Sequence, residues 1–433
     1  MTDPVLIQSI NNNKKDMTMM NLNVFAKLLN GNNVKKASVS MNNTVSASVK
    51  SSAKNSVKKI SAGKISNAVQ KGRPQTGNNW LARTTESCSD NKITVYDFNG
   101  TPLHLGEKDT KSSGGEGIVY TLPSNENLLV KVYKNETLKD AKKLQDIGKR
   151  IMDMVNLKQL SAMDFLAWPI MPVYNSNKEI IGFVMRKCSG NSVLAFRGLE
   201  NIQKYFPTAD RAFLVNVALD YVKKVNILAA SNVLINDFNP NNFLVDQSGN
   251  VSFIDCDSFQ IPSKGNTVNI TRTFFPFHSA PELLKNKNLL TAPRNIHLVE
   301  FGTAIILFNI LMCGQHPYNY YDPQNQSACG SPDENLINGR CPLGIGSGCR
   351  FPQGPWYNLW SHLTYGVKNA FIQTFRDGHS DPAKRTNLSQ WEQNLNELLY
   401  VMQKDPIRKD LNPKTAKPKQ DRNSKIGSSS SDF

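Results

Sequence analysis

The chain has 433 residues, of which 39% are hydrophobic and 20% are charged, a composition that excludes collagen-like, fibrous and wholly disordered proteins. No apolar run approaches the roughly 18 residues that a membrane-spanning helix needs. The formal net charge is +16, and most of it lies at the ends: residues 1–90 carry 13 Lys and Arg against 4 Asp and Glu, and residues 403–433 carry 8 against 4. Seven cysteines scattered over this length indicate reduced thiols rather than a disulfide framework.

The two basic ends are rich in Asn, Ser and Lys and are predicted to be disordered, because they offer too little apolar surface to offset the chain entropy lost on folding. The predicted arms are residues 1–91 and 403–433. They could contact acidic partners or anionic surfaces, including nucleic acid. Few aromatic residues stand among the lysines, which argues against stacking on single strands.

The first ten residues lack a basic region followed by an apolar core, so no Sec signal peptide is expected and the chain is predicted to be cytoplasmic. Bacterial secreted effectors often begin with Ser/Asn-rich arms, so a solubilising arm, a recruitment arm and a signal for non-Sec export into a host cell all fit residues 1–91.

Between the arms the periodicity predicts secondary structure in a definite order. Two short strands come first, then a helix capped by Asn135, then a second strand pair, a long helix, two more short strands and an apolar helix. In chain order these elements are strands 117–122 and 128–133, a helix from 135 to about 154, strands 167–173 and 179–186, helix 208–230, strands 243–245 and 251–254, and helix 295–313. A strand-rich part followed by a helical part indicates an α+β fold.

A glycine-rich segment, Ser112 to Tyr120, lies just before and within the first of these strands. Glycines let backbone N–H groups approach phosphate oxygens closely, although such a segment can also be a simple tight turn. Lys131 stands in the middle of the next apolar strand. A buried ammonium there needs a partner of opposite charge, which the phosphates of a nucleotide would supply. The alternative is that the aliphatic part of the Lys131 side chain extends to the surface and places the ammonium in water.

Three oxygen-bearing side chains abut the short strands 243–245 and 251–254. Asp237 and Asn242 come before the first strand, and Asp255 follows the second. The ends of a hairpin would bring them together, and carboxylate and amide oxygens suit Mg²⁺. Asp257, two residues further on, could add a carboxylate near the metal or cap the following turn; the turn is the preferred interpretation.

These motifs resemble the protein kinase superfamily. Asp237 and Asn242 match the DxxxxN catalytic loop, and Asp255 falls where the metal-binding Asp of DFG belongs. The DxNPxN loop and the DxD sequence are similar to those of bacterial eukaryotic-like Ser/Thr kinases. Ala280-Pro281-Glu282 resembles the APE motif, and Lys384 to Trp391 resembles a late RPTxxEW element.

The resemblance implies a bilobal kinase-like fold over residues 92–402, with a strand-rich N-lobe at 92–187 and a helical C-lobe at 188–402. It implies ATP and Mg²⁺ as cofactors and an unidentified protein substrate, with Lys131 and Asp237 as catalytic residues. Asn242 and Asp255 would bind Mg²⁺, and Arg385 would pair with Glu282 as a structural brace. The residues implied to contact ATP are Ser112, Gly114, Gly115, Gly117, Val119, Lys131, Met185 at the gatekeeper position and Lys187 in the hinge.

Some expected kinase residues are missing. Ile235-Asn236 replaces the His-Arg before the catalytic Asp, and Asn239 replaces the usual Lys. The helix glutamate that should pair with Lys131 has three candidate substitutes, Glu136, Asp140 and Asp146, and the buried Asp of a later helix would align with His297 or Val299.

Three functions therefore stay open at this level. The first is an active Ser/Thr kinase, the second a pseudokinase scaffold that binds nucleotide or partners, and the third a basic nucleic-acid adaptor. Three cysteines, Cys329, Cys341 and Cys349, lie near His316 in a predicted insertion, but their spacing lacks a CxxC pair and indicates loop thiols rather than a zinc site.

Overall fold

The computed structural model describes residues 94–108, 115–262, 268–269, 273–320, 322, 329–344, 349–350 and 355–416. Within this part, Thr94–Leu122 and Glu126 onward belong to one compact unit. The predictions for the arm at residues 1–91 lie outside the described residues. No helix in the described part is long and apolar enough to cross a membrane.

The N-terminal lobe, which we define as residues 94–187, is built on a sheet in which every pair of neighbouring strands is antiparallel. Among the described residues it has six strands in the order β2-β1-β5-β6-β4-β3. Their bounds are β1 Thr94–Tyr96, β2 Pro102–His104, β3 Gly117–Thr121, β4 Leu128–Tyr133, β5 Pro169–Tyr174 and β6 Ile180–Arg186. Strand β4 is buried along its whole length, because it lies between β3 and β6.

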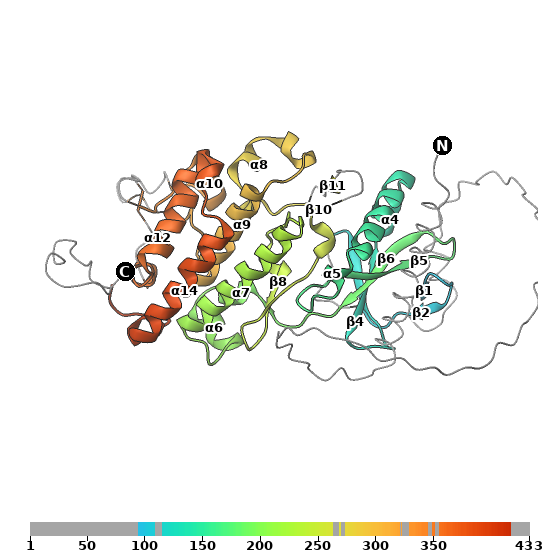
Figure 1. The fold of residues 1–433 in the computed structure, drawn as a ribbon, viewed down its shortest axis with the longest axis horizontal. Coiled ribbons are helices and arrows are strands. Elements are labelled where there is room, and N and C mark those ends of the chain that lie inside the picture. Colours follow the sequence, from blue (N-terminus) through green and yellow to red (C-terminus); the bar gives the residue numbers. More distant parts are fainter. Residues whose placement is uncertain are drawn as a thin grey trace, which may run out of the picture. The chain divides into compact units, whose positions relative to one another are not determined.

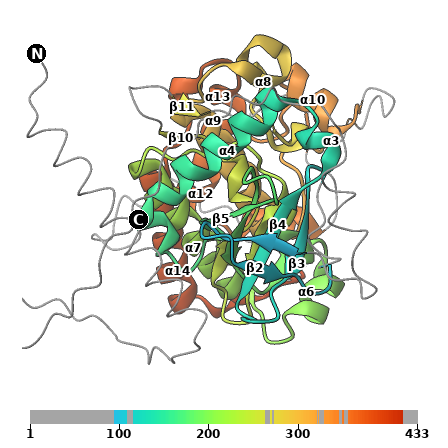
Figure 2. The same ribbon diagram turned by 90° about the vertical axis from the view of Figure 1, so that its right-hand side faces the viewer.

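Helix α4 (Ala141–Asn156) packs against β5 and β6 (Figures 1 and 2). The sequence predicts one helix that begins at Asn135, but the structure divides it into α3 (Asn135–Leu138) and α4. The reason is Asp140, whose extended backbone interrupts the helix and whose carboxylate accepts from the backbone N–H groups of Lys142 and Lys143. Asp140 is thus the N-cap of α4. A short helix, α5 (Lys158–Ser161), follows.

The C-terminal lobe, residues 188–416, is mainly helical. Its helices are α6 Leu199–Tyr205, α7 Arg211–Ala230, α8 Pro281–Lys285, α9 Ile296–Leu311, α10 Pro332–Asn338, α11 Pro355–Ser361, α12 Tyr365–Ile372, α13 Gly378–Ser380 and α14 Leu388–Lys404. Its short strands are β7 Asn191–Ser192, β8 Phe243–Val245, β9 Val251–Phe253, β10 Ile261–Pro262 and β11 Val268–Asn269. The predicted α+β class, with a strand-rich part before a helical part, is confirmed.

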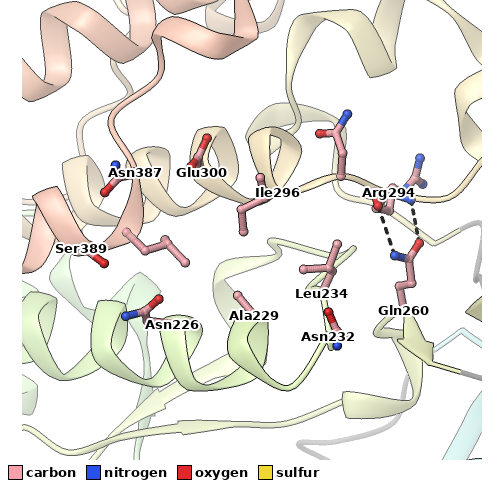
Figure 3. Close-up of a pocket in the computed structure, with 12 residues that line it drawn as sticks. Asn226, Ala229, Asn232, Leu234, Gln260, Arg294, Ile296, Glu300, Asn387 and Ser389 are labelled. Atoms are coloured by element: carbon pink, nitrogen blue, oxygen red, sulfur yellow. Dashed lines mark hydrogen bonds between the residues drawn. The ribbon is translucent and has the colours of Figure 1, made fainter.

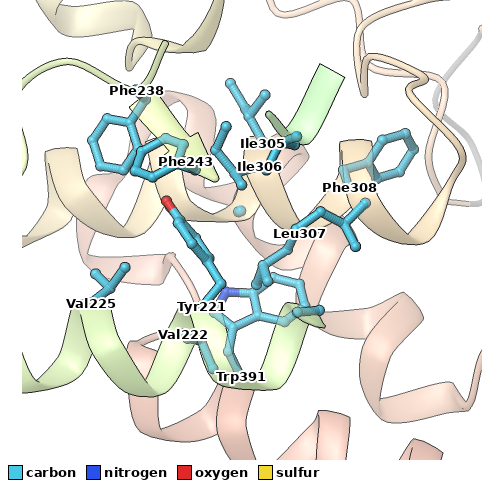
Figure 4. Close-up of a cluster of buried hydrophobic side chains, with 14 of the residues drawn as sticks. Tyr221, Val222, Val225, Phe238, Phe243, Ile305, Ile306, Leu307, Phe308 and Trp391 are labelled. Atoms are coloured by element: carbon cyan, nitrogen blue, oxygen red, sulfur yellow. The ribbon is translucent and has the colours of Figure 1, made fainter. Parts of the chain in front are cut away.

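The core of this lobe lies where α7 packs against both α9 and α14. Figure 4 shows Tyr221 of α7, Phe308 of α9 and Trp391 of α14 among the side chains that meet there. Helix α9 is buried on nearly all sides, which fits its lack of charged residues after Glu300. This rigid centre supports the loop before β8.

The described chain continues past residue 402, where the sequence analysis placed the end of the folded domain. Helix α14 ends at Lys404, and the following segment is attached to α11 and the residue after it. The Nδ2 atom of Asn358 donates to the carbonyl of Pro413 at 2.8 Å, and Nη1 of Arg408 donates to the carbonyl of His362 at 2.6 Å. Basic composition alone gave no sign of these backbone contacts.

Candidate active site

The hairpin of β8 and β9 brings two of the predicted site residues to one end. Phe243 pairs with Phe253 in the register, and the backbone N–H of Ile254 donates to the carbonyl of Asn242 at 2.9 Å. Asn242 and Asp255 therefore leave the hairpin on the same side. The Nδ2 atom of Asn242 lies 3.3 Å from Oδ2 of Asp237, so the loop before β8 places Asp237 beside them.

Asp237 is a buried carboxylate, 8% exposed. Burial and the neighbouring negative charge of Asp255 raise its pKa, while hydrogen bonds from Asn242 and from the backbone of Asn239 oppose the shift. A carboxylate with a raised pKa is a better proton acceptor. This is the electrostatic setting that a general base requires.

Lys131 lies in β4 between two cross-strand neighbours, Val119 of β3 and Phe183 of β6. Its Nζ atom donates to Oδ1 of Asp255 at 2.5 Å and to both carboxylate oxygens of Asp257, at 2.7 and 2.8 Å. Burial alone would lower the pKa of Lys131, but the two carboxylates outweigh it and raise that pKa. The lysine is therefore a fixed ammonium in the folded chain.

Asp255 holds a left-handed backbone conformation, with φ of 56°. Non-glycine residues adopt this conformation mainly where the surrounding structure imposes it, often at functional sites. Its side chain is 38% exposed, so its carboxylate is accessible to a ligand. Burial and the adjacent Asp257 raise the pKa of Asp255, against the opposing charge of Lys131.

Asp257 does not have the turn-capping role that the sequence analysis preferred for it. Its carboxylate does not cap the turn; it accepts hydrogen bonds from Lys131 and, at 2.6 Å, from the hydroxyl of Tyr133. Burial would raise the pKa of Asp257, but Lys131, Tyr133 and Arg150 together lower it. The sequence shows an isolated lysine in a strand and a DxD sequence, but neither feature indicates that Lys131 and Asp257 are in contact.

None of the three candidate helix acids is a partner of Lys131 in the contacts that the structure describes. Asp140 caps α4, and Glu136 and Asp146 are exposed. Helix α4 instead presents Arg150, which is 7% exposed. Its Nε donates to the backbone carbonyl of Asp257 at 2.8 Å, and Nη2 donates to the carbonyl of Phe259.

The glycine-rich segment is described only in part, since Ser112 and Gly114 lie outside the described residues. A Cβ on Gly117 would stand 3.1 Å from Cε of Lys131, whereas one on Gly115 would have no neighbour within 4 Å. Gly117 thus leaves room for the lysine stem. At the other end of the sheet, Met185 is buried in β6, and Lys187, which is exposed, donates its backbone N–H to Asn127 at 2.9 Å.

The loop that carries Asp237 contacts residues of the C-terminal lobe that the sequence analysis did not identify as functional. The Nδ1 atom of His278 lies 2.8 Å from the carbonyl of Phe238, which fixes the tautomer with the proton on Nδ1. The Phe238 ring packs so closely on α9 that a Cβ on Gly302 would stand 2.4 Å from it. The buried acid of α9 is Glu300, whose Oε2 lies 2.8 Å from Nδ1 of His297, and not residue 297 or 299.

Arg385 and Glu282 meet in a bidentate ion pair, with distances of 2.7 and 2.8 Å. The arginine side chain is fully buried and the glutamate is 28% exposed. Arg385 also donates to the carbonyls of Gly378 and His297, both at 2.9 Å. The pair connects α8, α9 and the segment just before α14.

A cavity of about 610 Å³ lies apart from these residues, between the end of α7 and the starts of α9 and α14 (Figure 3). Its lining is largely polar: Asn226, Asn232, Gln260, Arg294, Asn295, Glu300, Asn387 and Ser389, together with Ala229, Leu234, Ile296 and Leu388. Gln260 and Arg294 close one end through two hydrogen bonds between the Gln260 amide and the Arg294 backbone.

Comparison with known proteins gives sequence relatives but no family model that matches the chain. Two relatives are protein kinase YegI of Escherichia coli O157:H7, 28% identical over 231 residues, and of Escherichia coli strain K12, 28% identical over 230 residues. The matches cover 53% and 52% of this chain and 34% of each relative. Over these stretches the chain is therefore similar to proteins named as protein kinases.

Among solved structures, the chain is similar to the ROP18 kinase domain in complex with AMP-PNP and sucrose, with 15% sequence identity and a TM-score of 0.49. That match covers 75% of this chain and 88% of the other. The chain spans about a third of the length of its curated kinase relatives, 34%, so only part of those proteins is compared.

A nucleotide and Mg²⁺ are the groups that a protein kinase would bind, and the residues present here fit both. Lys131 offers a fixed ammonium for phosphate oxygens, and Gly117 keeps its stem unobstructed. Asp255 and Asn242 offer a carboxylate and an amide at one hairpin end. Because no group of three or more His, Cys, Asp or Glu side chains in the described part could hold a metal, phosphate oxygens and water would have to complete the coordination of Mg²⁺.

Proposed function

We propose that this chain is an ATP- and Mg²⁺-dependent protein kinase that transfers a phosphoryl group to serine or threonine hydroxyls. The observation that carries the proposal is the contact of Lys131 with Asp255 at 2.5 Å, at the end of the hairpin beside Asp237 and Asn242. One ammonium, two carboxylates and one amide then surround a single site. The choice of Ser and Thr rests on the resemblance of the catalytic loop to bacterial kinases.

The proposed chemistry divides among these groups. Lys131 binds and neutralises phosphate oxygens, and Asp255 with Asn242 would hold Mg²⁺, which supplies further neutralisation of the charge on the transferred group. Asp237 orients the acceptor hydroxyl and takes its proton on a carboxylate oxygen. Its hydrogen bonds from Asn242 and Asn239 fix the carboxylate, so little reorganisation is needed during the reaction.

The substitution Asp237→Asn tests this proposal, because it keeps the shape of the side chain and removes the proton acceptor. We expect transfer from radiolabelled ATP to the chain itself or to a generic protein acceptor to fall about 100-fold or more, while ATP binding persists. The matched control is Asp164→Asn, an exposed carboxylate, which should retain the wild-type rate. Transfer by Asp237→Asn at the wild-type rate would contradict the role of Asp237.

A pseudokinase scaffold is the second candidate, and the observation in its favour is that Glu136, Asp140 and Asp146 do not supply the expected helix carboxylate. Mg²⁺-dependent phosphoryl transfer by the wild-type chain that is lost in Asp237→Asn would exclude this candidate. ATP binding with no transfer under the same conditions would favour it.

A further inference from the structure

Asp257 is the most enclosed of the acidic groups around Lys131. The side chain of Asp257 is 6% exposed, whereas that of Asp255 is 38% exposed. Both oxygens of Asp257 lie on the ammonium of Lys131, and Oδ2 also accepts from the hydroxyl of Tyr133. A carboxylate so enclosed interacts with the protein, whereas the more accessible Asp255 can turn toward a ligand.

The segment that carries Asp257 is attached to helix α4 through its backbone. Arg150 donates to the carbonyls of Asp257 and Phe259, and all three of these residues are buried. The contacts of Arg150 therefore link α4 to Lys131 through residues 257–259. A carboxylate at this position can pair with Lys131 as a helix glutamate would.

We propose that Asp257 is a positioning residue for Lys131, with Tyr133 and Arg150 as its supports. The proposal rests on the proposed function, since it assumes that Lys131 contacts the phosphates of ATP. Asp257 holds the ammonium in place, so that Asp255, which also contacts Lys131, can exchange that contact for Mg²⁺. Without Asp257, Lys131 would be paired with Asp255 alone among the carboxylates described here, and lysine and metal would then compete for one carboxylate.

Nucleotide affinities measured by calorimetry test this role without requiring catalysis. Lys131 acts on phosphates, so we expect Asp257→Asn to weaken ADP and ATP binding about tenfold, the loss of one charged hydrogen-bonded contact. Adenosine, which has no phosphate, should bind within about twofold of wild type. The matched control is Asp146→Asn, an exposed acid on α4, which should leave all three affinities unchanged.

A double-mutant cycle separates positioning from an independent effect. If Asp257 acts through the lysine, the double variant Lys131→Met/Asp257→Asn should bind ATP no more weakly than Lys131→Met alone. Additive losses would overturn the proposal, and so would an Asp257→Asn variant that binds ATP as wild type does. A loss of adenosine affinity equal to the loss of ATP affinity would also overturn it, because it would indicate a general structural effect.

Tyr133→Phe provides a second variant if Asp257→Asn does not fold. It removes one hydrogen bond to Asp257, and we expect a smaller loss of ATP affinity, about threefold, again without loss for adenosine. Unchanged ATP affinity in a folded Tyr133→Phe variant would then overturn the proposal. A wild-type chain that binds ATP but transfers no phosphate would refute the proposed function and leave the cycle decisive for Asp257. A wild-type chain that binds neither ATP nor ADP would overturn both.

Discussion

His278 is a buried imidazole, 5% exposed, that supports the residue next to Asp237. Burial first, and then the nearby His316, whose ring centroid lies 6.0 Å away, lower the pKa of His278 to about 3, although its bond to the Phe238 carbonyl opposes the shift. His278 is therefore neutral at physiological pH. In the unfolded chain its pKa is near 6.5, so the unfolded state binds a proton first as the pH falls.

This difference predicts a loss of stability in acid. The contribution of neutral His278 is complete above pH about 6.5 and declines as the pH falls toward 3, by up to about 1.4 kcal/mol per pH unit. The variant His278→Gln retains an amide donor for the Phe238 carbonyl but cannot titrate. We expect the difference in unfolding free energy between pH 7 and pH 5, measured with urea, to be smaller in His278→Gln than in wild type.

The control for this measurement is His104→Gln, since His104 is exposed. It should show the same decline between pH 7 and pH 5 as wild type. A His278→Gln variant with an undiminished decline would contradict the assignment of the acid sensitivity to His278.

Whether a contact between two residues could be predicted from the sequence depends on how far apart they are along the chain. Asn242 and Asp255 flank one short hairpin at the same end, and Asp237 lies in the loop just before Asn242, so a local pattern was sufficient to predict that these residues are close. The contact of Lys131 with Asp257 joins residues 126 positions apart, and the contact of His278 with Phe238 joins residues 40 apart. Such contacts depend on how whole elements pack, and no local pattern encodes them.

At the scale of elements, strand and helix order could be predicted because hydrophobic periodicity is local. The interruption between α3 and α4 was missed because Asn135 and Asp140 are both good capping residues. In the structure Asn135 is the first residue of α3 and is not its cap, whereas Asp140 caps α4. The close approach of Phe238 to α9 was also hidden, since a glycine in an apolar helix gives no indication of which ring will occupy its space.

Two buried helical glycines give a matched test of this packing. A Cβ on Gly302 of α9 would stand 2.4 Å from the Phe238 ring, whereas a Cβ on Gly148 of α4 would meet Ile180 at an ordinary 3.5 Å. We expect Gly302→Ala to lower the unfolding free energy by about 1–3 kcal/mol through overpacking. Gly148→Ala should raise it by about 0.5–1 kcal/mol through helix propensity.

Because Phe238 follows Asp237, Gly302→Ala should also reduce the rate of phosphoryl transfer at saturating ATP, measured below the unfolding temperature. Stabilisation by Gly302→Ala similar to that by Gly148→Ala would show that the ring moves aside freely, which would contradict the rigid support inferred for the loop that carries Asp237.

For the molecule as a whole, the α+β class could be predicted from element order, whereas the limits of the folded part could not. Residues 405–416 have the composition of the predicted tail, yet Asp405–Ala416 is described, and part of this stretch contacts α11 and His362 through backbone carbonyls and Arg408. Composition reports how much apolar surface a segment can bury, but not whether its backbone finds donors on a neighbouring helix.

The ion pair of Arg385 with Glu282 joins residues 103 positions apart. Substitutions can test how much this long-range contact stabilises the C-terminal lobe. The guanidinium also lies 4.9 Å from the centroid of the Phe301 ring and donates to two backbone carbonyls. One side chain therefore makes an ion pair, a ring contact and two backbone hydrogen bonds in the C-terminal lobe. Lysine at this position would keep the charge but lose the planar fork. We expect Arg385→Lys to lower the unfolding free energy by about 3 kcal/mol, measured by urea unfolding.

Glu282→Gln should cost less, about 1 kcal/mol, because Glu282 is 28% exposed and Arg385 keeps its two carbonyl partners. The surface pair of Arg376 and Asp377, with side chains 39% and 40% exposed, is the matched control, and Arg376→Lys should change stability by less than about 0.5 kcal/mol. If Arg385→Lys cost no more than Arg376→Lys, the buried pair would not brace the lobe, and the connection between α8, α9 and α14 would have to lie in the apolar core alone.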